Sequence, residues 1–127
     1  MAKGTAERCD TIEECYERML AYAAKGLPHE GSEPATEIRA TLTRAAAAIG
    51  GLAGCCAAEA EGREPADRYR AFFSVVERDA RDSLAAIDVV RAQPHISSQL
   101  VDNLNASIHL RALLTDLFLV DEILKSR

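Results

Sequence analysis

The spacing of apolar residues between positions 38 and 56 restricts this chain to a helical fold more than any other feature. Apolar residues recur there at alternating steps of four and three, which places them on one face of an α-helix. The residues of this stripe are Ile38, Leu42, Ala45, Ile49, Leu52 and Cys56. Ser32-Glu33-Pro34 is typical of a helix start, with a capping serine, an acidic residue in the first turn and a proline where its missing N–H costs little. Gly62 is expected to end the helix. The pattern predicts one helix of about 27 residues, roughly 40 Å long.

Three further segments carry helix start and stop signals. We expect a helix over residues 11–26, opened by a capping box, with residues 1–10 before it poorly ordered. Others are expected over 64–94, bounded by prolines, and from a serine cap at 97 or 98 almost to residue 127. The connections are short, and the chain has 23 alanines but only 5% aromatic residues. These features predict a single domain over 1–127, an all-α antiparallel up-down four-helix bundle.

Three glycines interrupt the second predicted helix. Gly50, Gly51 and Gly54 each cost up to about 1 kcal/mol in a helix interior. With the neighbouring run Ala45 to Ala48 they form a surface that is almost free of side chains. Either the helix kinks here, or a neighbouring helix approaches closely and its packing offsets the lost propensity. The second interpretation is slightly favoured, and the sequence leaves both open.

The fourth predicted helix carries more apolar surface than one bundle core needs. Its large apolar residues, from Leu110 to Leu124, cover roughly 260° of the helix circumference, whereas a helix outside a monomeric bundle needs little more than about 100°. Asp116 and Asp121 interrupt the arc, so we expect this helix to be shared between the core and a subunit interface. The candidate interface residues are Leu110, Leu113, Leu117, Val120, Ile123 and Leu124. The chain is therefore predicted to form a homo-oligomer.

Net charge argues against a nucleic-acid or membrane partner. With 15 basic and 20 acidic residues the chain carries −5, and a nucleic-acid-binding domain is usually basic. An oligomeric ring could still concentrate arginines around one opening. The weak candidates for such contacts are Arg63, Arg68, Arg70, Arg78 and Arg81. We also expect no secretory signal and no membrane span, and therefore a cytoplasmic protein. The expected partners are further copies of this chain or an unidentified protein.

The residues that usually carry chemistry are scattered. The cysteines Cys9, Cys15, Cys55 and Cys56 lack the spacing of a metal site and are interpreted as reduced, buried thiols. None of the three histidines has a glutamate three residues before it, as a di-iron bundle requires. We therefore predict no catalytic residue, metal or cofactor, and no enzyme. A cavity between helices, lined by Tyr16, Tyr22, Cys55 and His109, remains an alternative site for a small ligand.

Residues 36–125 resemble a family of four-helix proteins encoded by intervening sequences in large-subunit ribosomal RNA genes. The resemblance rests on Arg44-Ala45-Ala46-Ala47-Ala48-Ile49, preceded by Ile38-Arg39, and on the aromatic cluster Tyr69-Arg70-Ala71-Phe72-Phe73. Where that family usually has Asn-Ile-Ala-Glu-Gly, this chain has Leu52-Ala53-Gly54-Cys55-Cys56. The resemblance implies a pentameric ring of bundles. Relatives include the accessory variability determinant of diversity-generating retroelements, whose basic members engage nucleic acid and a reverse transcriptase.

Three functions from different classes follow from these observations. The leading hypothesis is a non-enzymatic, ring-forming helical bundle that acts as a scaffold or interaction protein. The second is a nucleic-acid-associated accessory protein, resembling the retroelement proteins and using the arginine set. The third is a small-ligand binder with a site in an interhelical cavity.

Overall fold

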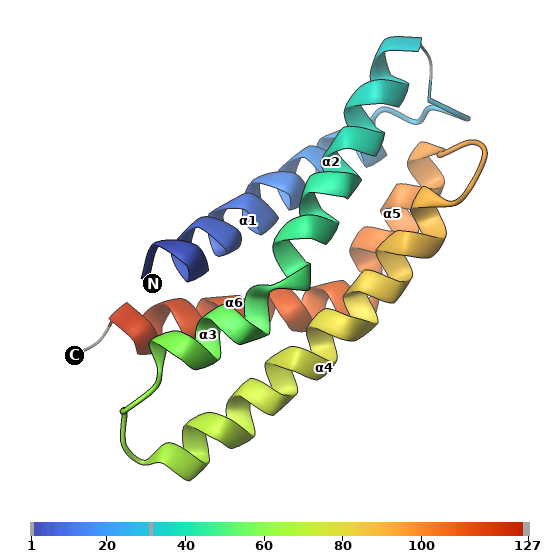
Figure 1. Ribbon diagram of the computed structural model, residues 1–127. Coiled ribbons are helices and arrows are strands. Elements are labelled where there is room, and N and C mark those ends of the chain that lie inside the picture. Colours follow the sequence, from blue (N-terminus) through green and yellow to red (C-terminus); the bar gives the residue numbers. More distant parts are fainter. Residues whose placement is uncertain (1, 31, 126–127) are drawn as a thin grey trace.

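The computed structural model describes residues 2–30 and 32–125, with side chains for 4–30 and 37–125. These residues form helices and connecting loops without a strand, which confirms the all-α prediction. The helices are α1 (Ala2–Ala24), α2 (Ser32–Gly50), α3 (Leu52–Glu59), α4 (Ala66–Arg91), α5 (Ser98–Ala106) and α6 (Ile108–Lys125). Figure 1 shows α2, α3 and α4 in one layer, with α1 and α6 behind them and the start of α1 near the end of α6.

The first helix begins earlier than its capping box predicts. Thr11 lies inside α1, and residues 2–10, expected to be poorly ordered, form its first turns. The predicted start at Thr11 is wrong because Thr5 and Cys9 are buried in the fold, so tertiary packing extends the helix past the local cap signal. Together with Ile12, Cys15 and Met19, these residues make one continuous apolar face.

The second predicted helix is broken at Gly51, so its expected continuity to Gly62 is wrong. Gly51 has φ −111° and ψ 8°, which ends α2 and starts α3. Arg8 reaches across from α1 and donates from Nη1 to the carbonyls of Ala47 and Ala48, both at 3.0 Å. A Cβ on Gly51 would lie 2.9 Å from that guanidinium group. The glycines therefore mark a bend, with an arginine side chain rather than a second helix against Gly51.

The fourth predicted helix is also broken, at Ser107, and its expected continuity is wrong. Ser107 is extended, with φ −64° and ψ 145°. Its N–H donates to Leu104 O, which closes α5, and its Oγ accepts from Leu110 N at 3.4 Å, which opens α6. α6 leaves the line of α5 and crosses α4 (Figure 1). One serine thus caps two helices and redirects more than half of the predicted element.

The remaining helix boundaries agree with the sequence signals. α4 follows Pro65 and ends at Arg91, shortly before Pro94. Ser97 is the N-cap of α5, and its Oγ accepts from Leu100 N at 3.0 Å. The stripe predicted for residues 38–56 is confirmed as buried, in spite of the bend at Gly51.

One stretch of the described residues, Glu37–Glu59, is apolar and long enough to cross a membrane by length and composition alone. It includes the bend at Gly51, and 39% of its most apolar 18-residue window is buried inside the protein. Its apolar character comes largely from alanine and from core residues such as Leu42 and Ile49. A core helix of any packed bundle has the same composition, so this stretch carries no membrane assignment.

Candidate functional site

A groove with a volume of about 690 Å³ lies between α3 and α4. We call it the α3–α4 groove. Small residues of α3 form one wall, and aromatic and charged residues of α4 form the other. The residues that define it include Ala53, Gly54, Ala57, Tyr69, Arg70, Phe73 and Glu77. It contains none of the four residues predicted to line an interhelical cavity.

Those four residues lie in separate parts of the molecule. Tyr22 is buried near the α4–α5 loop, where its hydroxyl donates to Ile96 O at 2.6 Å. Cys55 lies at the contact of α1 with α3, since a Cβ on Gly4 would be 3.4 Å from its Sγ. His109 is exposed on α6. The predicted lining of an interhelical ligand site is therefore wrong, and the groove between α3 and α4 is the better candidate.

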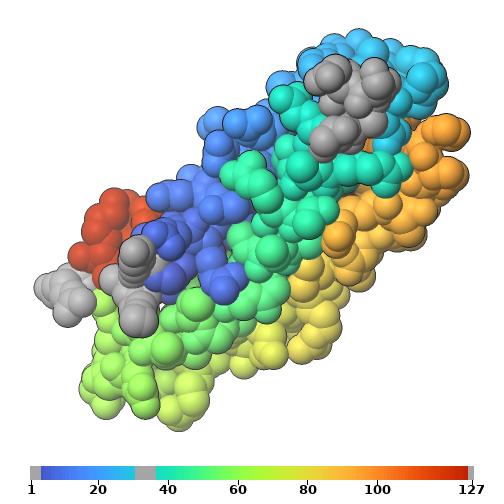
Figure 2. All heavy atoms as spheres, turned by 45° about the horizontal axis from the view of Figure 1, so that its top comes forward, coloured from blue at the N-terminus to red at the C-terminus, as the bar shows by residue number. Residues whose placement is uncertain are grey.

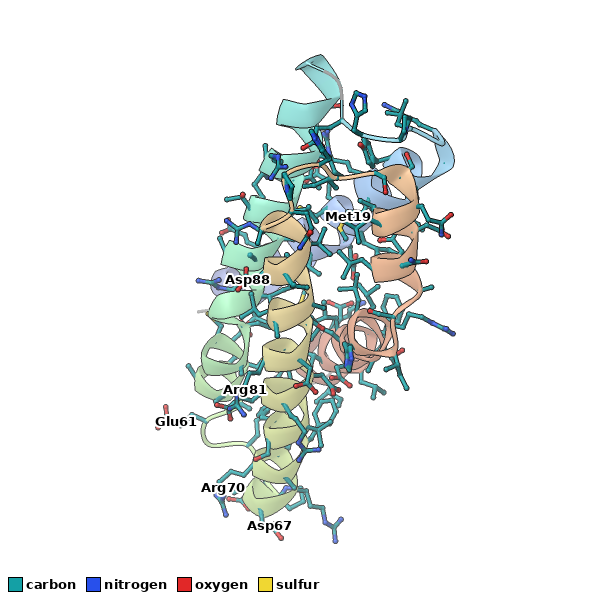
Figure 3. All side chains as sticks on the ribbon, turned by 90° about the vertical axis from the view of Figure 1, so that its right-hand side faces the viewer. Met19, Glu61, Asp67, Arg70, Arg81 and Asp88 are labelled. Carbon is teal, nitrogen blue, oxygen red and sulfur yellow. The ribbon has the colours of Figure 1, made fainter. Side chains whose placement is uncertain are left out.

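The arginine candidates for nucleic-acid contact do not form one basic surface. Figure 3 shows Arg70 and Arg81 well separated along α4, with the acidic Asp67 at the same end as Arg70. Arg81 is paired with Glu77 at 3.4 Å. Arg68 and Arg78 are exposed, and helical spacing places Arg68 on a different face from Arg70. The described part of α4 thus mixes basic and acidic groups on its surface.

Arg63 instead has a structural role. Its Nη1 donates to Ile123 O and its Nη2 to Leu124 O, each at 3.0 Å. These carbonyls belong to the last turn of α6, which has no intrahelical donors for them. Arg8 of α1 does the same for two carbonyls at the end of α2. Arginines from neighbouring segments therefore cap helix C-termini in this fold.

The predicted oligomer interface lies mostly inside the protomer. Leu110, Leu113, Leu117 and Val120 are buried, and Ile123 and Leu124 are half-buried. This part of the prediction is wrong because α6 turns the inner side of its apolar arc onto the core of the same chain, where it packs against α4. The large apolar residues that remain exposed on α6 are Ile108 at 74%, Phe118 at 60% and Leu119 at 49%.

The exposed residues share the side of α6 that faces away from its own core. At about 100° per residue, Leu119 lies within roughly 20° of Ile108, and Phe118 flanks them on one side. We call these three residues the outer face of α6. α4 runs past α6 in the opposite direction, because Ser83 donates to His109 O while Arg63 reaches the far end of α6. This register places Val75, itself 37% exposed, at the level of Leu119, so apolar surface continues onto α4.

Two carboxyl groups, the buried Asp116 and the half-buried Asp79, meet where α6 crosses α4. Asp116 is buried, and its Oδ2 has no conventional donor among the described residues. Burial, and then the neighbouring carboxyl of Asp79, raise the pKa of Asp116 to about 7. Two carboxylates repel each other, so one proton shared between them is needed for a hydrogen bond. The sequence showed Asp116 only as an interruption of the apolar arc.

The thiols are poor nucleophiles at neutral pH. Burial, together with nearby thiol and carboxyl groups, raises the pKa values of Cys9 and Cys56 to about 12. The thiolate is the reactive form of cysteine, so these residues stay protonated and inert. All four cysteines are free; Cys9, Cys15 and Cys56 are buried as predicted, whereas Cys55 is only half-buried. No group of three or more metal-ligating side chains occurs among the described residues.

Comparisons with known proteins give no relative. The chain matches no known protein family, no curated protein and no solved structure. The resemblance to the intervening-sequence family therefore stays a prediction.

Proposed function

We propose that this chain is a non-enzymatic interaction protein that assembles with copies of itself through the outer face of α6. The observation that carries the proposal is the exposure of Ile108, Phe118 and Leu119 on one side of one helix. Single exposed apolar residues are normal on protein surfaces, but several on one face mark a surface that another molecule covers. The proposed form is the ring of helical bundles, pentameric by resemblance, in the cytoplasm.

The position of these residues at the crossing with α4 adds support. Val75 adds an exposed apolar side chain on α4. Arg111, Thr115 and Glu122 share the outer side of α6 with the exposed apolar residues, and such a mixture of apolar and polar groups is ordinary in a subunit interface. A second copy is the proposed partner, because an oligomer removes this face from water in every chain at once.

Light scattering on the purified chain, coupled to size exclusion, tests the proposal. The wild type is expected to be larger than a protomer at tens of micromolar. Phe118→Asp and Leu119→Asp are expected to give protomers, since each places a charge in the proposed interface. Val89→Asp is the matched control, because Val89 is 59% exposed, close to the 60% of Phe118, but lies on α4 beyond the crossing with α6.

Two results would overturn self-assembly through this face. One is a wild type that elutes and scatters as a protomer at every concentration tested. The other is Val89→Asp dissociating the oligomer as fully as Phe118→Asp, which would show that any added surface charge has this effect. Circular dichroism of each variant keeps loss of assembly separate from loss of folding.

A second candidate function, binding of a small apolar ligand, is favoured by the α3–α4 groove. Tyr69 and Phe73 offer aromatic surface there, and Arg70 and Glu77 offer polar contacts at its edge. A Cβ on Gly54 would meet only open space, so Gly54→Leu fills the groove without a clash. A ligand that raises the melting temperature of the wild type but not of Gly54→Leu would support this function. Nucleic-acid association has less support, because Arg63 caps α6 and Arg81 pairs with Glu77.

A further inference from the structure

Two histidines from different loops meet at one end of the molecule. His29 lies in the loop between α1 and α2, and His95 lies in the loop between α4 and α5. Their ring centres are 5.9 Å apart, with the ring planes inclined by 52°. Both residues are exposed. Figure 2 shows the atoms of these two loops adjoining at one end of the molecule.

We propose that His29 and His95 together bind a divalent transition-metal ion such as Zn²⁺. Neutral imidazole nitrogen is a preferred ligand of zinc, copper and nickel. With Zn–N bonds of about 2.0–2.1 Å and an N–Zn–N angle at or above tetrahedral, two imidazole ring centres lie roughly 5–6 Å apart. The observed separation of 5.9 Å between the ring centres falls in that range.

The hydrogen bonding of His29 prepares one ring nitrogen for a metal. Its Nδ1 lies 3.0 Å from the carbonyl oxygen of Glu30. A carbonyl only accepts, so Nδ1 carries the hydrogen and donates it, and the lone pair of the neutral ring is on Nε2. Histidine ligands in metal sites commonly donate their second ring nitrogen to a backbone carbonyl in this way, which fixes tautomer and orientation.

The backbone on both sides of the histidine pair is held in place. Before His29, Leu27 and Ser98 exchange two hydrogen bonds, Ser98 N to Leu27 O at 2.8 Å and Leu27 N to Ser98 Oγ at 2.9 Å. After His29, the Glu30 carboxylate accepts from the N–H of Ile96, the residue next to His95. The two loops are thus joined on either side of His29 and just after His95, so metal binding needs little reordering of the backbone.

Glu30 itself is committed elsewhere and is not a third ligand. Its Oε1 accepts from Ile96 N, and its Oε2 accepts from Arg39 Nε at 2.7 Å. Burial alone would raise its pKa, but the hydrogen bonds from the Ile96 N–H, from its own N–H and from Arg39 lower the pKa overall. The site therefore offers two imidazole ligands, and water completes the coordination of the ion.

Calorimetric titration of the untagged chain with Zn²⁺ tests this site. One ion is expected to bind per chain, and His29→Ala or His95→Ala is expected to weaken binding by roughly tenfold or more. Mutation of a residue that only hydrogen-bonds to a metal ligand already lowers metal affinity by about tenfold or more. Removal of a ligand itself should therefore lower it at least as much. His109→Ala is the matched control, because His109 is the third histidine and is exposed on α6. Cys55→Ser tests the half-buried thiol, and both controls should bind Zn²⁺ as the wild type does.

A structural readout separates this site from scattered surface binding. An ion held by both loops should slow hydrogen exchange at the N–H groups of Ile96 and Ser98 in the wild type, but not in His29→Ala. Wild-type affinity in the double variant His29→Ala/His95→Ala would overturn the proposal. So would equal weakening by His109→Ala or Cys55→Ser, or no binding of Zn²⁺ at millimolar concentration.

Discussion

The two ends of this molecule differ in how completely the chain hydrogen-bonds its own polar groups and covers its own apolar surface. At the loop end, formed by residues 25–30 and 92–97, the polar groups are densely bonded: Ser98 Oγ donates to Tyr22 O at 2.7 Å, and Tyr22 donates to Ile96 O. Near α3 and α6, buried carboxyl oxygens of Glu59 and Asp116 have no conventional donor among the described residues. The outer face of α6 and the α3–α4 groove also lie in this half.

This difference indicates which half of the molecule is held together by contacts within the chain alone. Groups of the loop end are fixed by the protomer's own backbone, so this end is preorganised. The half with α3 and α6 leaves apolar surface and a groove exposed, which a partner molecule would cover. The same helix α6 shows both conditions, since its inner side is buried and its outer face is open.

The largest change in the free energy of unfolding is expected between substitutions on the inner and outer sides of α6. Leu117 is 0% exposed, so Leu117→Ala should lower the free energy of unfolding by about 2–5 kcal/mol, through lost burial and a cavity. Leu119→Ala should lower it by no more than about 0.5 kcal/mol at concentrations where the chain is a protomer. Urea denaturation of dilute protein measures both. Equal losses in the two variants would contradict the assignment of one side to the core and the other to the surface.

The loop end is expected to depend strongly on Arg39. Its guanidinium donates to Arg91 O, Gln93 O and Pro94 O at the end of α4, and also pairs with the Glu30 carboxylate, of which only 6% is exposed. Arg39→Ala should cost about 2–3 kcal/mol, because it leaves a buried carboxylate without its cation. Arg91→Ala is the control: its pair with Asp88 is on the surface and is worth at most about 1 kcal/mol. Similar losses in both variants would argue against a special role for Arg39.

The carboxyl pair predicts a distinct pH dependence in the other half. Burial and the carboxyl of Asp79 raise the pKa of Asp116 from an ordinary value of 3.8 to about 7, so the folded chain holds this proton up to pH about 7. The unfolded chain releases this proton first, so the free energy of unfolding should fall as the pH rises between these values and then level off. Asp116→Asn should remove this dependence and be more stable than the wild type at pH ~8, by on the order of 2 kcal/mol.

Denaturant unfolding between pH ~4 and ~8 measures this effect. Asp82→Asn is the control, since Asp82 is an exposed carboxylate on the same helix as Asp79. A wild type whose stability rises through this window, or a control that changes the profile as Asp116→Asn does, would show that Asp116 does not hold the proton.

The smallest effects are expected around the bend at Gly51. Arg8→Ala should cost about 1 kcal/mol, because the carbonyls of Ala47 and Ala48 lose their donor at the end of α2. Gly54→Ala should instead stabilise the chain by up to about 1 kcal/mol, since its Cβ has open space and alanine favours the helix. Thermal unfolding followed by circular dichroism measures both. A loss of stability in Gly54→Ala would mean that the bend extends into α3.

Local signals in the sequence predicted much of the helical structure but little of the site. The prolines at 65 and 94 and the cap at Ser97 act within one turn, so the limits of α4 and the start of α5 could be predicted. The histidine pair could not, because 66 residues separate its members along the chain and only the packing of two loops joins them. Asp79 and Asp116 were missed for the same reason, although Asp116 on an apolar stripe was a signal of burial.

The sequence by itself determined that this chain is all helical, where α4 begins and ends and where α5 begins, and that residues 110–124 carry surplus apolar surface. These properties follow from periodicity and capping, which act over a few residues. Tertiary structure decided that Arg8 meets Gly51 at a bend and that Ser107 turns α6 across α4. It also decided which side of α6 is open, because periodicity states how much apolar surface a helix has and only packing against α4 determines which part is covered.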